Sequence, residues 1–370
     1  MENKNILIVC PYFYPEGGGL ELYAFKTAEY LSKSNNVIVV CATKEKSKIE
    51  DIGFKIIRKK PAFFVSNTPI NFNLRKDIEL IIIAQNINLI IAHSPVPYYA
   101  DIAAGVAKKH NIPFVLHYHS SSLYKGNLII DAIAFLYENL FEKKLFNSSK
   151  KIISASYYPI DKKLAKYKEK TSVIAPFIDL KKFKPSQSLK KEILFVGQLD
   201  KSHRWKGLDN LLEAFSIFQG KNPDYKLIVA GDGNYKKHYQ KKSEKLGVKE
   251  KIIFAGKMSQ NEMIDLYQNC YFVVVPSISD VEGTPTVLFE AMASGKPVIG
   301  GNAGGIPYII KKENCGIIAD ARNIKELAEK IGYLANDKMA YGIFSKNCLK
   351  NIEEYGQEKS LKKIEFILDN

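Results

Sequence analysis

The sequence predicts an α/β protein of two doubly wound, Rossmann-like domains, each a parallel sheet covered by helices on both faces. Short apolar, β-branched runs alternate with longer amphipathic segments through both halves of the chain, which is the pattern of parallel sheets joined by helical crossovers. A length of 370 residues exceeds what one hydrophobic core usually organises. Periodicity fails over residues 177–188, where Pro, Ser and Lys accumulate, and this predicts a linker.

The apolar runs place the strands of both sheets. In the first half we expect strands near residues 5–10, 36–41, 53–58, 88–92, 112–118, 150–154 and 172–175. In the second half we expect them near residues 191–197, 225–231, 251–256, 271–276, 297–300 and 315–318. We therefore predict a first domain over residues 1–184 and a second over residues 185–354. Residues 355–370 are expected to form a final helix that packs back on the first domain.

The composition is that of a water-soluble globular protein, with 46% hydrophobic and 25% charged residues. No apolar run approaches the length of a membrane span, and residues 1–5 lead straight into a strand without a cleavage site, so we expect a cytoplasmic protein. The five cysteines are scattered and form no C-x-x-C pair. Buried thiols account for them best.

The net charge is +15, and the excess is spread over the chain. Residues 1–180 hold 24 Lys and Arg against 16 Asp and Glu, and residues 181–370 hold 30 against 23. A lysine-rich solvated surface is one explanation. Attraction to an anionic membrane leaflet, worth about 1 kcal/mol per basic residue near the surface, is the other, and it would make the protein peripheral on the inner face of the cell membrane. Nucleic acid is disfavoured because no binding motif interleaves the basic residues with aromatics.

An unusually apolar helix is predicted between Gly126 and Ser149. Its apolar residues occupy more than one face, which favours a buried core helix over a helix that lies on a membrane surface. Lys143 and Lys144 near its end keep the second interpretation open.

A glycine cluster, Gly17 to Gly19, follows the first strand and opens a helix that ends near Ser32. Glycines let a backbone approach a ligand closely, and the free amides of a helix start favour an anion. A tight structural turn is the alternative. The cluster is not G-x-G-x-x-G, and no acidic residue ends the second strand, so a site for NAD is disfavoured.

Histidines mark the ends of two strands in the first half. His119 ends the strand near residues 112–118, and His117 points to the same side of that strand. A metal pair is conceivable, but no carboxylate is near in sequence, so we expect no metal. His119 is interpreted as a polar or proton-sharing group in a cleft, or as a structural histidine, and His93 is a candidate of the same kind.

The second half begins with a strand, a loop and a helix. Gly197 ends the strand, and Arg204 and Lys206 precede the helix that begins near Leu208. Cations at this position can reach a diphosphate. Solvated surface residues are the alternative, and convergence with other loops at the same sheet edge favours the ligand.

The most informative segment is residues 277–299. It places Glu282 before a helix and Glu290 within it, on either side of amides that have no intrahelical partner. Such amides favour phosphate, and the carboxylates suit hydroxyl groups. The segment therefore predicts a phosphorylated sugar ligand rather than a carboxylate pair of a hydrolase.

Together these segments resemble the retaining glycosyltransferases of the GT-B fold, family four, also called glycosyl transferases group 1. The resemblance covers nearly the whole chain, and its most specific part is the pair of acids separated by seven residues. The matching segments are Gly17–Gly19, Val196–Gly197, Lys206–Gly207, Glu282–Val298 and Gly304–Pro307.

The resemblance implies a nucleotide diphosphate sugar donor bound mainly by the second domain, and an acceptor on the first. Glu290 would hold the ribose hydroxyls, Glu282 the donor sugar and Lys206 the diphosphate. The implied catalytic residues are His119, Glu282 and Lys206. The implied donor-binding residues are Gly18, Gly19, Gly197, Arg204, Lys206, Glu282, Gly283, Thr284, Pro285, Thr286, Val287 and Glu290. The implied acceptor-binding residues are Gly17, Glu21 and His93.

The resemblance also implies electrostatic catalysis without a metal or another cofactor, and the chain has no D-x-D motif. Two positions depart from the family pattern. Gln198 stands where many relatives have arginine, so that one diphosphate contact is missing or is supplied by Arg204. Tyr308 stands where many have glutamate, and both changes leave the donor open.

The function expected from the resemblance is transfer of a hexose or N-acetylhexosamine from a donor, UDP-linked in the first place, to a glycan or lipid-linked acceptor in cell-surface polysaccharide or glycoconjugate synthesis. A GDP-mannose-dependent mannosyltransferase and a non-enzymatic carbohydrate-binding relative are the alternatives. A nucleotide-sugar epimerase, which would consume donor without an acceptor, is a further one. We expect a monomer or a weak dimer.

Overall fold

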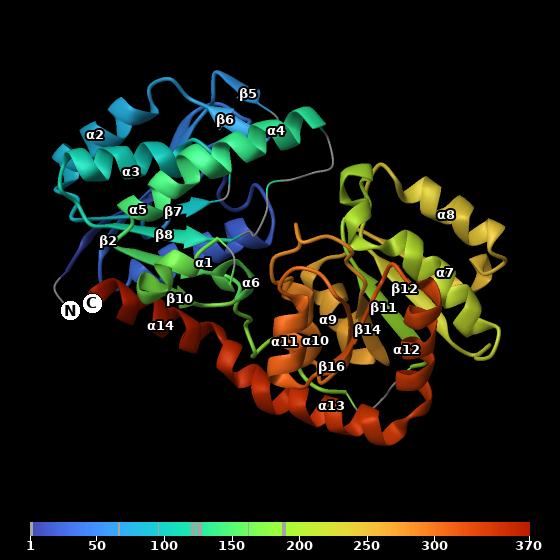
Figure 1. The fold of residues 1–370 in the computed structure, drawn as a ribbon. Coiled ribbons are helices and arrows are strands. Elements are labelled where there is room, and N and C mark those ends of the chain that lie inside the picture. The colour runs from blue at the N-terminus through green and yellow to red at the C-terminus, as the bar shows by residue number, and fades with distance from the viewer. Residues whose placement is uncertain are drawn as a thin grey trace. The chain divides into compact units, whose positions relative to one another are not determined.

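The computed structural model describes residues 3–65, 67–94, 96–119, 123, 128–161, 163–186 and 190–370. The chain divides into two compact units, Met1–Ala175 with Glu358–Asn370, and Pro176–Gln357 (Figure 1). The first unit thus gives way to the second between Ala175 and Pro176, whereas the sequence placed the boundary between residues 184 and 185.

The first unit contains an eight-stranded sheet in the order β10-β9-β8-β7-β1-β2-β4-β3, in which every pairing is parallel except that of β3 with β4. Its strands are β1 (Asn5–Val9), β2 (Asn36–Ala42), β3 (Lys48–Asp51), β4 (Lys55–Lys59), β7 (Leu89–Ser94), β8 (Phe114–Tyr118), β9 (Lys151–Ser154) and β10 (Thr171–Val173). A separate hairpin pairs β5 (Phe63–Val65) with β6 (Thr68–Ile70). The central strands are buried on both faces, as parallel strands covered by helices must be.

The helices of this unit cover both faces of the sheet (Figure 1). They are α1 (Gly19–Leu31), α2 (Leu74–Gln85), α3 (Tyr99–Lys109), α4 (Leu128–Tyr137), the π-helical turn Glu138–Glu142, α5 (Lys143–Ser148) and α6 (Tyr158–Asp161), with a 3₁₀ segment at Ala165–Lys170. The last helix, α14 (Gln357–Asp369), lies beside α1 and the chain start, because Glu365 accepts a hydrogen bond from Tyr30 and Asp369 pairs with Lys4 at 2.7 Å.

The second unit contains a six-stranded parallel sheet in the order β13-β12-β11-β14-β15-β16. Its strands are β11 (Glu192–Val196), β12 (Lys226–Ala230), β13 (Ile252–Gly256), β14 (Phe272–Val275), β15 (Val298–Gly301) and β16 (Gly316–Ala319). Its helices are α7 (Leu208–Gln219), α8 (Lys236–Lys245), α9 (Gln260–Asn269), α10 (Thr286–Ala293), α11 (Ile306–Glu313), α12 (Ile324–Asn336) and α13 (Lys338–Asn351), with 3₁₀ segments at Lys201–Lys206, Lys249–Lys251 and Ile352–Tyr355. Helices α7, α8 and α12 share one core, and α10, α11 and α13 pack together.

Each strand that the sequence predicts is present, within three residues of its expected ends. Strands β3, β5 and β6 were not predicted. Each has only three or four residues, too few for a clear strand signal in the sequence. All five cysteines are buried free thiols, as expected.

The prediction of a buried core helix between residues 126 and 149 is wrong over α4 and the following π-helical turn. Residues 126 and 127 lie outside the described residues. Five large apolar side chains of this segment are more than half exposed, namely Ile133, Phe135, Leu136, Leu140 and Phe141. Among the side chains that the structure describes here, from residue 131 to residue 149, the buried apolar ones are Ala134 and, in α5, Leu145 and Phe146.

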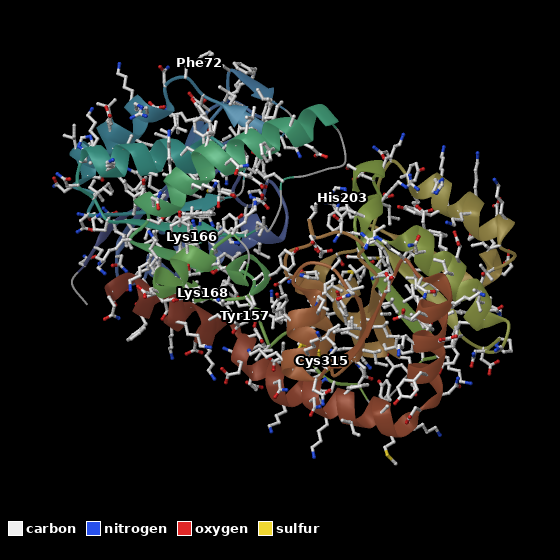
Figure 2. All side chains as sticks on the ribbon, viewed as in Figure 1. Phe72, Tyr157, Lys166, Lys168, His203 and Cys315 are labelled. Carbon is white, nitrogen blue, oxygen red and sulfur yellow. The ribbon has the colours of Figure 1, made fainter. Side chains whose placement is uncertain are left out.

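Several lysines occur between residues 163 and 170, and only some of them are solvated surface residues. Lys163 lies 3.2 Å from the buried carboxylate of Glu142, and Lys170 donates to backbone carbonyl oxygens at the end of α5. Lys166, labelled in Figure 2, is exposed. Among the helices of the described residues, none has the length and apolarity that a membrane span requires.

Candidate functional site

Each sheet has one strand at which the strand order changes direction, because strands that follow in the chain are added first on one side of it and then on the other. In the first sheet this strand is β1, between β2 and β7, and in the second it is β11, between β12 and β14. Ligands of open α/β sheets bind beyond the carboxyl ends of the strands at such points. The loops after β1, β7 and β8 in the first unit, and after β11 and β14 in the second, are therefore the candidate sites.

In the second unit Lys206 and Glu282 form an ion pair. The Lys206 ammonium lies 3.0 Å from Glu282 Oε2, and the Ser277 hydroxyl donates to the same oxygen at 2.8 Å. Glu282 is 6% exposed. A carboxylate this buried is stable only when it is paired and hydrogen-bonded, and both conditions are met here.

The backbone around β11 positions Lys206. A side chain at Gly197 would overlap the Lys206 stem and the Phe195 ring, so that glycine leaves the path of the lysine open. Gly207 has φ of 76° and caps the start of α7, and a Cβ there would overlap the carbonyl oxygen of Pro276. The Lys206 ammonium also lies 4.6 Å from the centre of the Trp205 ring.

The loop that carries Glu282 packs backbone against backbone on the loop after β15. The Gly305 N–H donates to the Gly283 carbonyl at 2.9 Å, and the Gly304 N–H donates to Asp280 Oδ1 at 3.0 Å. Gly304 has φ of 55°, and a Cβ there would overlap the carbonyl oxygen of Glu282. Glycine at 304 is therefore a condition for this position of Glu282.

Helix α10 begins directly after this loop. Pro285 is its N-cap and offers no side-chain cap, so the amides of Thr286 and Val287 open the helix without a capping oxygen. Thr284 is buried, and among the described residues its hydroxyl has no hydrogen-bond partner. These donors lie beside Gly283 and suit an anionic ligand.

Glu290 lies on α10 and is half-buried. The Tyr267 hydroxyl donates to Glu290 Oε2 at 2.6 Å. Burial raises the pKa of the Glu290 carboxyl, and the hydrogen bond from Tyr267 opposes that change. Within the part of the chain that the structure describes, no hydrogen bond occupies the other carboxylate oxygen.

Arg204, predicted as a diphosphate contact, is already paired. Its Nε lies 3.2 Å from Asp209 Oδ2, and its guanidinium stacks over the Tyr235 ring. Asp209 also contacts His238 at 2.8 Å and Lys242 at 3.3 Å. Arg204 thus belongs to a charged cluster at the start of α7, with half of its side chain exposed.

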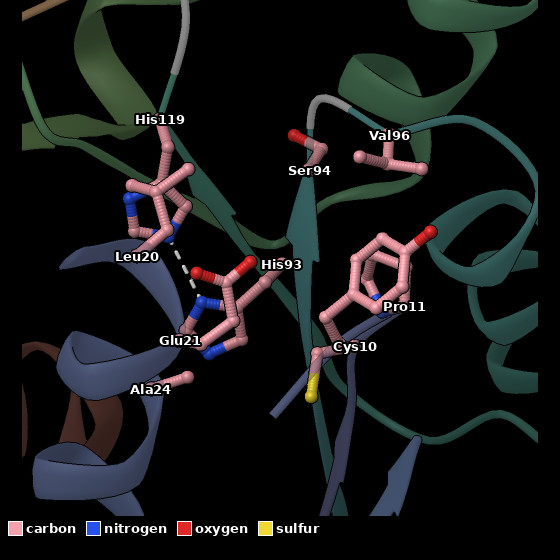
Figure 3. A pocket seen from close by; sticks show the side chains of 10 residues that line it. Cys10, Pro11, Leu20, Glu21, Ala24, His93, Ser94, Val96 and His119 are labelled. Atoms are coloured by element: carbon pink, nitrogen blue, oxygen red, sulfur yellow. Dashed lines mark hydrogen bonds between the residues drawn. The ribbon is translucent and has the colours of Figure 1, made fainter. Parts of the chain in front are cut away.

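In the first unit a small pocket lies at the carboxyl ends of β1 and β7 (Figure 3). It has a volume of about 40 Å³. Its lining includes Glu21, His93 and His119, which were predicted to bind substrates, and Cys10, Tyr12 and Ser94, which were not. The Ser94 hydroxyl is buried without a hydrogen-bond partner among the described residues.

Three histidines meet behind this pocket. His93 Nδ1 and His119 Nε2 are 2.9 Å apart, and the His117 ring packs against the His93 ring. Burial lowers the pKa of His119 to about 4 and lowers the pKa values of His93 and His117. All three imidazoles are therefore neutral at neutral pH and act through hydrogen bonds or lone pairs rather than charge.

The glycine cluster opens α1, and its three residues are exposed. Glu21 Oε2 accepts a hydrogen bond from the Gly18 N–H at 2.6 Å. Gly17 has φ of 110°, and a Cβ there would overlap the Glu21 side chain. Three of the predicted residues, Gly17, Gly18 and Glu21, therefore contact one another. The Glu21 carboxylate is hydrogen-bonded to the Gly18 amide, which was expected to bind a ligand.

Two contacts of the site were not predicted from the sequence, those made by Ser277 and Tyr267. Ser277 is the first residue of the segment 277–299, from which the ligand site was predicted, so its hydroxyl could have been proposed as a partner of Glu282. Tyr267 lies on α9, and nothing in its local sequence points to Glu290.

Comparison with known proteins agrees with this geometry. The chain matches the family Glycosyl transferases group 1 over residues 177–359 and Glycosyltransferase Family 4 over residues 17–182. An uncharacterized glycosyltransferase of Haemophilus influenzae is 25% identical over 339 residues, which cover 86% of this chain and 91% of that protein.

Two solved structures resemble the whole chain. Sucrose-phosphate synthase of Thermosynechococcus elongatus has a TM-score of 0.77 at 17% identity, covering 99% of this chain and 98% of that one. Anabaena HepE in complex with UDP has a TM-score of 0.75 at 18% identity, covering 99% of each chain.

The protein is thus a transferase enzyme with the GT-B fold. It belongs to the glycosyltransferases of group 1, family 4.

The contact between the two loops predicts a selective effect of Gly304→Ala. The added methyl group must displace the Glu282 carbonyl, and alanine is strained at this φ. We expect destabilisation by about 1–3 kcal/mol in urea unfolding. Gly342→Ala on α13, where nothing lies near a Cβ, is the control and should stabilise by about 0.5–1 kcal/mol. An equally stable Gly304→Ala protein would contradict the proposed constraint.

Proposed function

We propose that this glycosyltransferase moves a hexose or N-acetylhexosamine from a nucleotide diphosphate sugar, UDP-linked in the first place, to a glycan or lipid-linked acceptor, with retention of the anomeric configuration. The process it serves would be cell-surface polysaccharide or glycoconjugate synthesis. The observation that carries the proposal is the Lys206–Glu282 ion pair beside the open start of α10.

The donor would occupy the carboxyl edge of the second sheet. The Lys206 ammonium and the amides of Thr286 and Val287 are the groups available for a diphosphate, because all are cationic or N–H donors at one edge. The free oxygen of Glu290 would accept from the ribose hydroxyls, and Glu282 would accept from the donor sugar. HepE, which shares the fold, is solved with UDP, and this supports the choice of the uracil nucleotide.

The acceptor would contact the first unit, at the pocket lined by Glu21 and His93. His119, neutral because burial lowers its pKa to about 4, would exchange hydrogen bonds with the donor sugar near the reacting carbon. A neutral imidazole both donates and accepts, which suits sugar hydroxyls.

Catalysis would be electrostatic. Departure of the nucleotide diphosphate develops negative charge, and a fixed ammonium and helix-start amides stabilise that charge without reorganising. The Lys206–Glu282 pair holds the ammonium in place before the donor arrives. We propose that the transfer step uses no metal ion.

Glu290→Gln tests the ribose contact. The change removes charge-assisted hydrogen bonds worth roughly 1.5–3 kcal/mol each, so calorimetry should show UDP-sugar affinity reduced at least about tenfold. Because burial raises the pKa of Glu290, wild-type affinity should fall on acidification at a higher pH than it would for an exposed glutamate. The variant should lack this pH dependence.

The control for this change is Glu329→Gln, at an exposed glutamate on α12 of the same unit. Unchanged affinity of Glu290→Gln for every nucleotide sugar tested would remove the residue from the donor site. If the wild type bound GDP-mannose more tightly than UDP-sugars, the proposed donor would be a guanine nucleotide sugar instead of a uracil one.

Lys206→Met tests the diphosphate contact. Loss of one fixed group that stabilises developing charge typically lowers kcat by about 10²–10³. The double variant Lys206→Met/Glu282→Gln removes the buried unpaired carboxylate that the single change leaves, and it should remain as slow. Lys325→Ala, at an exposed lysine of α12, should turn over like the wild type. Wild-type rates in Lys206→Met would return the lysine to a structural role.

We also propose that the first unit docks on a membrane surface with anionic lipids. Ile133, Leu136 and Leu140 recur at helical spacing on the exposed side of α4 and its π-helical turn. Lys143 and Lys144 follow, both exposed, and the Lys144 ammonium lies over the Phe141 ring. On an anionic membrane the apolar side chains would enter the boundary of the acyl chains, and the adjacent lysines would contact the headgroups.

Vesicle co-sedimentation tests this docking. The wild type should bind phosphatidylcholine vesicles that contain phosphatidylglycerol more strongly than pure phosphatidylcholine vesicles, and salt should weaken the binding. Leu136→Ser/Leu140→Ser should lose most of it. Met339→Ser/Ile343→Ser removes exposed apolar side chains from α13 and should bind like the wild type. Equal binding by both double variants would contradict the docking surface.

A further inference from the structure

The three histidines of the first unit are brought together by two neighbouring strands. His93 on β7 and His117 on β8 are directly paired in the parallel register, so their side chains leave the same face of the sheet. The backbone N–H of His119 donates to the Ser94 carbonyl, and this hydrogen bond holds the imidazole of His119 beside the other two. The arrangement follows from strand pairing and is not a chance contact of flexible side chains.

The imidazole nitrogens have the spacing of a metal site. One ring nitrogen from each of the three residues lies within 4.8 Å of the others, and one His93–His119 pair is at 2.9 Å. Zinc bound tetrahedrally at 2.0–2.1 Å requires nitrogens about 3.3 Å apart. The 2.9 Å separation of His93 and His119 is somewhat shorter than that value, and the nitrogens of all three residues lie within 4.8 Å of one another.

Hydrogen bonding within the protein leaves the cluster unsatisfied. Among the described residues, His93 Nε2 and both nitrogens of His117 are buried without a partner. Buried polar atoms almost always have one, and His117 is fully buried. The Tyr23 ring packs against all three imidazoles.

The cluster is also open on one side. His93 and His119 line the pocket of Figure 3, together with Glu21 and Cys10. Its volume of about 40 Å³ is enough for a water molecule. Three histidines with one accessible position are the usual donor set of an open zinc site.

We propose that His93, His117 and His119 together bind one divalent transition-metal ion, Zn²⁺ in the first place. Imidazole donors suit zinc and other late transition metals, whereas Mg²⁺ and Ca²⁺ take oxygen ligands. The inference rests on the described residues of the first unit. The site shares His93 and His119 with the pocket proposed for the substrates, but metal binding is measured without any sugar transfer.

The test is metal binding by the purified full chain after treatment with a chelator. In competition with a chromophoric chelator at pH 7.5, the wild type should bind one Zn²⁺ per chain. Co²⁺ should give the visible absorption of a tetrahedral site. Loss of a second-shell partner already costs about 10–100-fold in metal affinity, so His117→Ala and His93→Ala should each weaken Zn²⁺ binding at least about tenfold and abolish the Co²⁺ spectrum.

The matched control is His110→Ala, at a histidine of the same unit outside the cluster. It should bind Zn²⁺ like the wild type. Circular dichroism without metal shows whether each variant is folded, and His117→Asn, which keeps a polar side chain, replaces His117→Ala if that variant is unfolded. Zn²⁺ should raise the Tm of the wild type but not of either folded His117 variant. A wild type that binds no stoichiometric Zn²⁺, or a folded His117 variant that binds as tightly, would overturn the proposal.

Discussion

The site of the second unit depends on the close approach of two loop backbones. The carbonyl oxygen of Glu282 occupies the space that a side chain at 304 would need, and the Gly305 N–H holds the adjoining carbonyl of Gly283. This contact fixes the end of β14 against the end of β15, and with it the start of α10. From this backbone position the Glu282 carboxylate reaches Lys206, with 3.0 Å between Oε2 and the ammonium.

The same constraint explains why an ion pair is retained at a buried position. Removing a carboxylate from water costs several kcal/mol unless close partners compensate, and the net stability gained from such pairs is small. The ion pair instead fixes a position. Glu282 and the space left open by Gly197 hold the Lys206 side chain in place before any ligand arrives. A preordered ammonium costs no reorganisation when negative charge develops beside it.

The sequence predicted the features that depend on short local patterns, and it did not predict contacts between residues far apart in the chain. Strand positions follow from apolar runs, and Lys206, Glu282 and Glu290 follow from strand-loop-helix patterns, because both signals lie within short segments. The partner Tyr267 does not, since α9 reaches Glu290 only through the packing of the sheet. The outward face of α4 was misjudged because a stripe of apolar residues has the same sequence signature whether a core or another surface covers it.

The histidine cluster connects the two kinds of chemistry considered for the first unit. A neutral imidazole has one lone-pair nitrogen and one N–H, and the tautomer decides which nitrogen does which. His93 Nδ1 and His119 Nε2 are 2.9 Å apart, so one of them donates a hydrogen bond to the other, and the tautomers decide which. A metal ion that took the lone pair of His119 would leave its other nitrogen as a fixed donor. Metal binding would thus convert His119 from a group that donates or accepts into one that only donates, and a sugar hydroxyl beside it would be bound through its oxygen alone.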